Sequence, residues 1–326
     1  MKPNQYAPLI GSESFAGMWK KHNGDTTAIS KETGVSVRNI FLARRRAERD
    51  LQITLVAQKP GVQALIHHHK ARVSLQIENE IIPFAGDVHK WPGEYTTVQR
   101  AYISIVKYLK PRYVILCGDV FDGARISRHG RIGFMESRPT VADELKAVGD
   151  FLTEVENAAP KGAMLIWCLG NHDARYETYL AANAPEMENV EGMHLKDKFP
   201  KWRPCWSVHI NEGTPDHTVV KHRWHSGVHA TYNNVLKGGV HIVTGHRHVG
   251  DMRKYANFSG LKYGIDAGFM ADVDDQQFVH YTEDNSKDWT SCFPILTYRG
   301  GRMMRPEYAQ KWDEDHVEFR GELIKV

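Results

Sequence analysis

The hydrophobic positions along the chain predict two parts of different architecture. In the first fifty residues they recur every three to four positions, as at Phe15, Met18 and Trp19, which is the spacing of one helical face. From residue 73 onward, short apolar runs alternate with amphipathic helical stretches. That pattern is typical of an α/β domain whose strands are buried on both faces. Residues 73–87 predict a β-hairpin, and the stretch 51–72 between the two parts predicts a linker.

The N-terminal part ends with a pair of short predicted helices, 26–33 and 37–50, separated by a turn that contains Gly34. Two short helices joined by such a turn are typical of the helix-turn-helix motif. Glycine suits the turn because it adopts a positive φ without steric cost. The positions expected to face inward on the second helix are Val37, Ile40, Phe41 and Ala43.

Composition excludes several classes of protein. Hydrophobic residues make up 41% of the 326 residues and charged residues 25%, so wholesale disorder is excluded. No apolar run reaches the ~18 residues of a membrane span. The N-terminus has no hydrophobic stretch of the signal-peptide kind, so we expect a cytoplasmic protein without a membrane partner.

The net charge of +3 is unevenly distributed. Residues 1–72 contain 12 Lys/Arg against 5 Asp/Glu, whereas the remaining residues contain 30 basic and 34 acidic side chains. The basic N-terminal part, called the head below, is followed by a mildly acidic remainder of the chain. This distribution predicts a polyanionic partner at the head.

Five apolar runs in the second part each end in residues that can bind a metal. The carboxyl ends of strands in an open α/β sheet meet at one edge, so we expect these side chains to converge. They are Asp87 and His89, then Asp119 and Asp122, then Asn171, His172 and Asp173, then His225, and finally His246 and His248.

These residue types favour a pair of borderline divalent ions. Imidazoles and carboxylates bind manganese, iron, zinc or nickel. Two such ions ~3.5–4 Å apart can activate water and stabilise the attacking and leaving oxygens of a displacement at phosphorus. The sequence therefore predicts a cationic site for a phosphate ester.

The order of these motifs resembles the calcineurin-like metallophosphoesterase family, whose pattern is D-x-H, GDxxD, GNH[DE], H and GHxH. The resemblance implies two sheets packed face to face as a β-sandwich flanked by helices, preceded here by a small all-α domain. It also implies two divalent cofactor ions, with manganese favoured and iron, zinc, nickel or magnesium possible. The implied ligands are Asp87, His89, Asp119 and His248 for the first ion, and Asp119, Asn171, His225 and His246 for the second.

The resemblance also implies roles for the residues around the ligands. His172 would protonate the leaving oxygen or stabilise the transition state, Asp173 would orient His172, and Asp122 would support the ligands. Arg175 follows this block closely and could clamp a substrate phosphate. The alternative for Arg175 is a surface salt bridge.

The fourth motif leaves a choice of histidine. The family has His followed directly by Gly, whereas Ser226 intervenes here, and His222 and His229 lie nearby. We favour His225, because an apolar strand leads to it and the turn His-Ser-Gly follows it.

The N-terminal part resembles a Fis-like helix-turn-helix unit, on the residues GDTTAISKETGVSVRNIFLARRR. The start of its last helix would meet base edges and its end would meet phosphates. The implied DNA-binding residues are Ser36, Arg38, Asn39, Arg44, Arg45, Arg46 and Arg49. The alternative is a three-helix module that contacts protein. This head combined with this catalytic domain resembles proteins of tailed phages, which implies the cytoplasm of a bacterial host.

We therefore expect a metal-dependent phosphodiesterase with DNA as its partner, most simply a DNA nuclease. Residues 124–139 contain four arginines against one glutamate, which suits a phosphate backbone, although such a stretch is also typical of a solvated loop. One alternative function is a phosphatase, or a phosphodiesterase for cyclic nucleotides or other small molecules. Another is a DNA-binding regulator with a silent site. The oligomeric state is left open.

Overall fold

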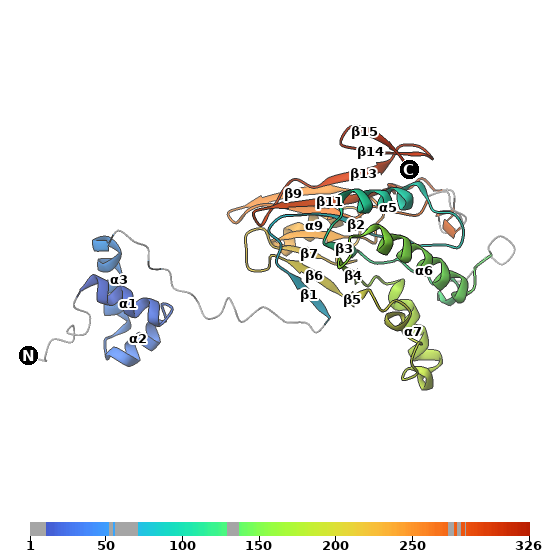
Figure 1. Cartoon of the computed structure of the whole chain (residues 1–326). Coiled ribbons are helices and arrows are strands. Elements are labelled where there is room, and N and C mark those ends of the chain that lie inside the picture. The colour runs from blue at the N-terminus through green and yellow to red at the C-terminus, as the bar shows by residue number, and fades with distance from the viewer. Residues whose placement is uncertain are drawn as a thin grey trace, which may run out of the picture. The chain divides into compact units, whose positions relative to one another are not determined.

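The computed structural model describes residues 11–51, 55, 71–128, 137–272, 277–278, 282–283 and 285–326 (Figure 1). The chain divides into two compact units, Met1–His69 and Lys70–Val326, and each is described by itself. Most of the predicted linker 51–72 lies outside the described residues. Among the helices that are described, none combines the length and the apolar character needed to cross a membrane.

Three helices form the described part of the first unit. They are α1 (Ser12–Lys21), α2 (Thr26–Thr33) and α3 (Val37–Leu51), close to the predicted bounds. Phe15, Trp19, Ile29 and Ile40 are buried together and form its core. The turn between α2 and α3 places Gly34 at a φ of 69°, in the left-handed region expected for glycine.

The residues exposed on the outward face of α3 differ from those expected from the sequence. Ile40 and Ala47 are buried, and Ala43 packs against them, which is the spacing of one helical face. Phe41 follows Ile40 by about 100° around the helix, so it points outward and is 46% exposed. Val37, one turn before Phe41, is exposed as well. The expectation that Val37 and Phe41 face inward is wrong.

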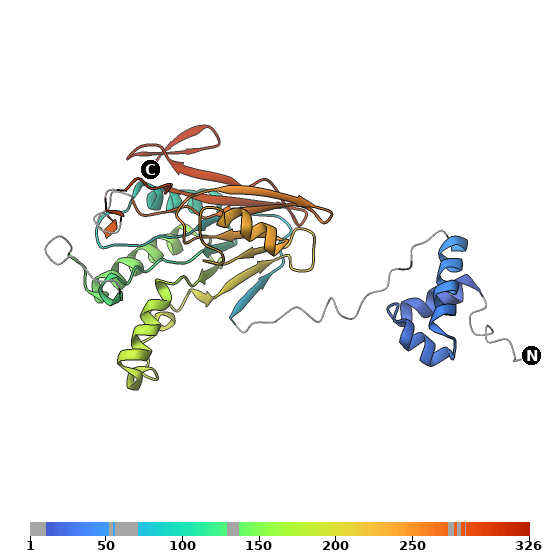
Figure 2. The same cartoon turned by 180° about the vertical axis from the view of Figure 1, so that it is seen from behind.

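Two sheets form the framework of the second unit (Figures 1 and 2). The first has the order β1-β6-β7-β8-β10-β9. Its strands are β1 (Arg72–Leu75), β6 (Ser207–Ile210), β7 (Thr218–Val220), β8 (His241–Thr244), β9 (Met252–Asn257) and β10 (Gly260–Asp266).

The second sheet has the order β15-β14-β13-β11-β2-β3-β4-β5, with β12 paired to β11. Its strands are β2 (Glu80–Ala85), β3 (Tyr113–Leu116), β4 (Met164–Cys168), β5 (Arg203–Cys205), β11 (Cys292–Arg299), β12 (Arg302–Met303), β13 (Glu307–Lys311), β14 (His316–Phe319) and β15 (Glu322–Lys325).

Burial on both faces of β3 shows how the layers stack. Val114 and Leu116 pack with the helices, whereas Ile115 and Cys117 pack into the core between the two sheets. This alternation follows from the two-residue period of a strand. The result is a mixed α/β fold of two sheets packed face to face, as the family resemblance implied.

Helices lie on the outside of the sheets. In Figure 1, α5 (Thr97–Leu109) and α6 (Val141–Ala158) lie against the sheet that contains β2 and β3. The helix α9 (Ala230–Gly238) contacts β8, β9 and β10 of the other sheet. The remaining elements are α7 (Asp173–Asn183), α8 (Leu195–Lys198) and the short 3-10 helices η2 (Ala124–Ile126) and η3 (Pro185–Met187).

The predicted hairpin at residues 73–87 is wrong. Strand β1 pairs in parallel with β6 in one sheet, whereas β2 pairs with β3 and β11 in the other. Between them Ile77 is buried, and its N–H donates to Asn211 Oδ1 over 2.7 Å. An anchored apolar residue in the connection lets the chain cross from one sheet to the other.

Candidate metal centre

The predicted metal-site residues stand in unusual backbone conformations at strand ends. Positive φ values occur at Asp87 (50°), His89 (39°), Asp119 (50°), His246 (75°) and His248 (65°). Residues other than glycine rarely adopt this region, and such strain is concentrated at functional sites. Each turn aims a side chain from the end of β2, β3 or β8 toward a common edge.

Glycines precede these residues because the loops approach one another closely. A Cβ atom at Gly170 would collide with the carboxylate of Asp119, and one at Gly245 would collide with that of Asp87. These two glycines therefore make room for a potential ligand that comes from a different strand.

Asp87, His89 and His248 form one group of potential ligands. Asp87 Oδ1 lies 3.2 Å from His248 Nε2 and 3.9 Å from His89 Nε2. The backbone N–H of His246 donates to Asp87 Oδ2 over 2.8 Å, which fixes this buried carboxylate. Phe269 stacks on His248 with 4.5 Å between the ring centroids.

Asp119, His222 and His246 form a second group. His222 Nδ1 donates to the carbonyl of Cys117 over 2.9 Å, which leaves Nε2 facing Asp119 Oδ2 at 3.0 Å. A ring nitrogen held in this way by a carbonyl is typical of a metal-binding histidine. The backbone N–H of His172 donates to the other Asp119 oxygen over 2.8 Å.

Among the buried atoms of this site, His89 Nε2, Asn171 Oδ1 and His248 Nδ1 form no hydrogen bond with any described residue. Buried polar atoms normally have a partner, so these residues fit metal ions held between them. Burial alone would lower the pKa of His222, but the carboxylates of Asp119 and Asp87 outweigh it and raise that pKa to about 10. This concentrated negative charge favours a cation at the same place.

His225, the histidine favoured from the sequence, belongs to neither group, whereas His222 belongs to the second; the buried Nε2 of His225 has no hydrogen-bond partner among the described residues. Its ring lies against Trp224, 4.7 Å between centroids, and its backbone N–H donates to Asn234. His222 stands two residues after Val220, the last residue of β7, so strand alternation carries it to the same inner face.

Asp122 supports two histidines at once. Its Oδ1 lies 2.8 Å from His89 Nδ1 and 3.0 Å from His172 Nδ1. Burial would raise the pKa of Asp122, but the hydrogen bonds from His172 and His89 outweigh it and keep the carboxyl ionised. Asp122 therefore orients the potential ligand His89 and the predicted catalytic His172 together.

Asp173 does not orient His172, contrary to the expectation. It stands at the first position of α7, fully buried, and its carboxylate points back into the loop after β3. It accepts hydrogen bonds from the backbone N–H groups of Asp119, Val120, Phe121 and Gly170, and from the indole N–H of Trp167. Asp173 therefore shapes the loop that holds Asp119.

Arg175 lies beside His172. Its Nη2 is 3.3 Å from His172 Nε2, and its Nη1 donates to the carbonyl of Asp122 over 2.9 Å. Arg175 forms no salt bridge with any described residue, so the surface salt-bridge alternative does not hold.

The loop 124–139 is only partly described. Arg125 Nη2 donates to the carbonyl of Arg138, and Arg138 donates to a backbone carbonyl at the start of the same loop. Arg128 is exposed, and Arg131 lies outside the described residues. Two of the four arginines therefore hold the loop itself together.

Asp266 was missed by the sequence reasoning. One of its carboxylate oxygens accepts from the backbone N–H groups of Val249, Gly250 and Gly268, so it shapes the loop that follows His248. Burial, and then Asp87, raises the pKa of Asp266 to about 7. The sequence contains a pattern that could have identified Asp266, because the run YGIDAG, like the metal motifs, is an apolar run followed by Asp and Gly.

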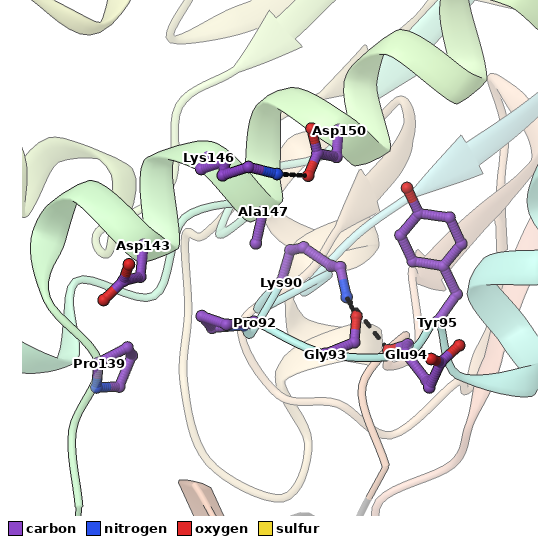
Figure 3. A pocket seen from close by; sticks show the side chains of 10 residues that line it. All are labelled: Lys90, Pro92, Gly93, Glu94, Tyr95, Pro139, Asp143, Lys146, Ala147 and Asp150. Atoms are coloured by element: carbon purple, nitrogen blue, oxygen red, sulfur yellow. Dashed lines mark hydrogen bonds and ion pairs between the residues drawn. The ribbon is translucent and has the colours of Figure 1, made fainter.

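A cavity of about 350 Å³ lies beside α6 and is lined by none of the grouped ligands (Figure 3). Its walls include the carboxylates of Glu94, Asp143 and Asp150. The ammonium group of Lys90 points to the carbonyls of Gly93 and Glu94. Lys146 pairs with Asp150 over 2.6 Å, and since no grouped ligand lines this cavity, the metal groups remain the candidate place for the reacting ester.

Two packed sheets with carboxylates and imidazoles at their strand ends define a metallohydrolase. The model of one family, described as calcineurin-like phosphoesterase, matches residues 82–273. The chain belongs to this family and is a metal-dependent phosphoesterase. The family typically uses two divalent ions, in agreement with the two groups of ligands.

The chain also resembles solved structures of low sequence identity. Vacuolar protein sorting 29 from Cryptosporidium parvum is 13% identical with a TM-score of 0.38, covering 77% of this chain and 97% of that chain. Wild-type Vps29 from Entamoeba histolytica complexed with Zn²⁺ is 11% identical with a TM-score of 0.38, and the match covers 75% of this chain and 98% of that chain. Vps29 from Chaetomium thermophilum is 10% identical, TM-score 0.38, covering 76% and 96%. No curated protein matches the chain.

Proposed function

We propose that this phosphoesterase is a phosphodiesterase that cleaves nucleic acid, with DNA as its substrate. The phosphoesterase chemistry follows from the family. The observation that supports a nucleic-acid substrate is the exposed basic face of α3, carried on a pair of helices with helix-turn-helix spacing.

One ion would be held by the group that contains Asp87, His89 and His248, and the other by the group that contains Asp119, His222 and His246. Asn171, with its unpartnered buried oxygen, would complete the second set. Such ions supply an activated water and neutralise charge on the phosphate. We propose manganese for both, which metal analysis of the purified protein tests.

His172 is proposed to act on the leaving oxygen. Asp122 holds its Nδ1, so Nε2 is the atom free to donate a proton toward the substrate. Arg175 lies 3.3 Å from that Nε2, close enough for its guanidinium to bind a phosphate oxygen next to it. These two side chains would position the ester and its leaving group.

On the head, Arg38 at the start of α3 is the proposed base contact, and Arg45 and Arg49 towards its end are the proposed phosphate contacts. All three are exposed, and Arg38 and Arg45 form no ion pair with any described residue. Arg44 is a poorer candidate, because it pairs with Glu48 over 2.9 Å and lies over the ring of Trp19. Ser36 accepts the backbone N–H of Asn39 and so caps α3.

Cleavage of plasmid DNA and single-stranded DNA in the presence of Mn²⁺ tests the substrate. We expect the wild-type chain to nick or degrade DNA, and Asp119→Ala to lose turnover while it keeps DNA affinity. A small chromogenic diester serves as the comparison substrate. Robust turnover of that diester with no cleavage of any DNA or RNA form would establish the small-molecule phosphodiesterase instead.

Duplex binding over a range of salt concentrations tests the head. Arg38→Ala with Arg45→Ala should weaken binding and reduce the slope of log affinity against log salt by ~0.9 for each lost phosphate contact. Lys31→Ala, which removes an exposed cation from α2, serves as the matched control. Equal affinity of the double variant and the wild type at every salt concentration would show that the head is not the DNA-binding module.

A further inference from the structure

The hairpin formed by β6 and β7 contains another group of metal-ligand side chains. His209 lies in β6, and Glu212 and His217 lie in the loop that leads to β7. His209 Nδ1 is 3.0 Å from His217 Nε2 and 3.7 Å from Glu212 Oε1. One ligand atom from each residue lies within 4.8 Å of the others.

This group is separate from the catalytic centre. His217 stands just before β7, whereas His222 of the catalytic centre stands just after it. Five residues of extended chain span roughly 16 Å at ~3.3 Å per residue. The two sites therefore lie at opposite edges of the same sheet.

We propose that His209, Glu212 and His217 form a zinc site that secures the β6–β7 hairpin. Two imidazoles and one carboxylate are a zinc donor set. With Zn–N and Zn–O bonds of ~2.0–2.1 Å, a tetrahedral ion separates its ligand atoms by about 3.3 Å. The observed separations of 3.0 and 3.7 Å lie on either side of that value, so small side-chain shifts suffice.

The hairpin loop is already ordered around the site. Asn211 adopts a φ of 54°, and its side chain accepts from the N–H of Ile77 and donates to the carbonyl of the same residue. The carbonyl of Asn211 accepts from Thr214, which closes the turn. Ligands on a turn that is held in this way lose little conformational entropy when they bind an ion.

Burial, and then the nearby cations Arg72 and Lys221, lower the pKa of His209 to about 3, so its imidazole is neutral, the form that binds zinc. Arg72 Nη1 donates over 3.1 Å to Glu212 Oε1, the oxygen that lies 3.7 Å from His209 Nδ1, so the oxygen that would bind the ion is held in place by Arg72. Carboxylates that bind metals are commonly hydrogen-bonded to a neighbouring group as well. Zinc would bind both nitrogens as neutral imidazoles, and the proton that lies between them would move to the other nitrogen of its own ring. Glu212 and His217 are partly exposed, whereas His209 is buried, so an ion can enter from solvent.

Zinc content of the full chain after loading with Zn²⁺ and dialysis tests this site. We expect His217→Gln and Glu212→Gln each to hold one zinc equivalent fewer per chain than the wild type. Glu212→Gln keeps an acceptor for Arg72, so it decides the matter if His217→Gln does not fold. The matched control is His316→Gln, which alters a partly exposed histidine 2.9 Å from the carboxylate of Asp313.

Turnover of the small diester by the metal-loaded variants should stay at the wild-type level, because the hairpin is remote from the catalytic groups. Added zinc should raise the melting temperature of the wild type more than that of either variant. The proposal is overturned if both variants hold as much zinc as the wild type. It is equally overturned if His316→Gln loses the same amount, since the zinc would then be bound nonspecifically.

Discussion

Asp122 accepts hydrogen bonds from both His89 and His172, and this leads to a quantitative prediction for Asp122→Asn. This substitution keeps the shape of the side chain but removes the negative charge of the oxygen that accepts hydrogen bonds from the two Nδ1–H groups. A hydrogen bond to a charged acceptor contributes ~1.5–3 kcal/mol and one to a neutral acceptor ~0.5–1.5 kcal/mol. The loss is about 1 kcal/mol for each histidine, and about 2 kcal/mol for both corresponds to roughly a 30-fold effect.

The assay is kcat/KM for a small chromogenic diester at saturating Mn²⁺, together with a Mn²⁺ titration. We expect kcat/KM to fall by roughly 30-fold and Mn²⁺ affinity to fall as well, since removing a partner of a ligand typically costs ~10–100-fold in metal affinity. Asp150→Asn, an exposed carboxylate paired with Lys146, should have no effect. A folded Asp122→Asn protein with wild-type kcat/KM and Mn²⁺ affinity would refute the role assigned to Asp122.

Three further substitutions distinguish the roles that the structure assigns from the roles expected from the sequence. His222→Ala should lose Mn²⁺ binding and diester turnover, whereas His225→Ala should keep both; the reverse pattern, measured by metal analysis and initial rates, would restore His225 as the ligand. Asp173→Asn should lower the free energy of unfolding by at least about 3 kcal/mol, because one amide oxygen cannot accept the N–H groups that now share two carboxylate oxygens. Urea denaturation measures this loss, and an unchanged midpoint and slope would contradict it.

Much of the catalytic unit could be predicted from local patterns. The apolar runs around Ile82, Ile115 and Ile166 are strands because they are buried on both faces, and each run ends in glycine and a polar residue. Those glycines are needed where loops from different strands almost touch. Each motif therefore consists of a few consecutive residues that can be recognised in the sequence. For this reason the sequence alone predicts that Asp87 and Asp119 lie in one site.

The head was predictable to a lesser extent. The helical spacing that includes Ile40 predicted α3, and Gly34 predicted the turn before it. The exposure of Phe41 was not predictable, because apolar character alone does not tell which of two adjacent positions meets the other helices. The contact of Arg44 with Trp19 likewise joins residues of different helices.

The sequence by itself determined the strand ends, the ligand types and the family to which the catalytic unit belongs. These features are local, since each depends on a few consecutive residues and their hydrophobic period. Only the tertiary structure decided that His222, rather than His225, lies against Asp119, and that Asp122, rather than Asp173, contacts the ring of His172. It also decided that β1 and β2 belong to different sheets. The physical reason is that a side chain's partner is chosen by direction and packing between distant segments, which neighbouring residues do not encode.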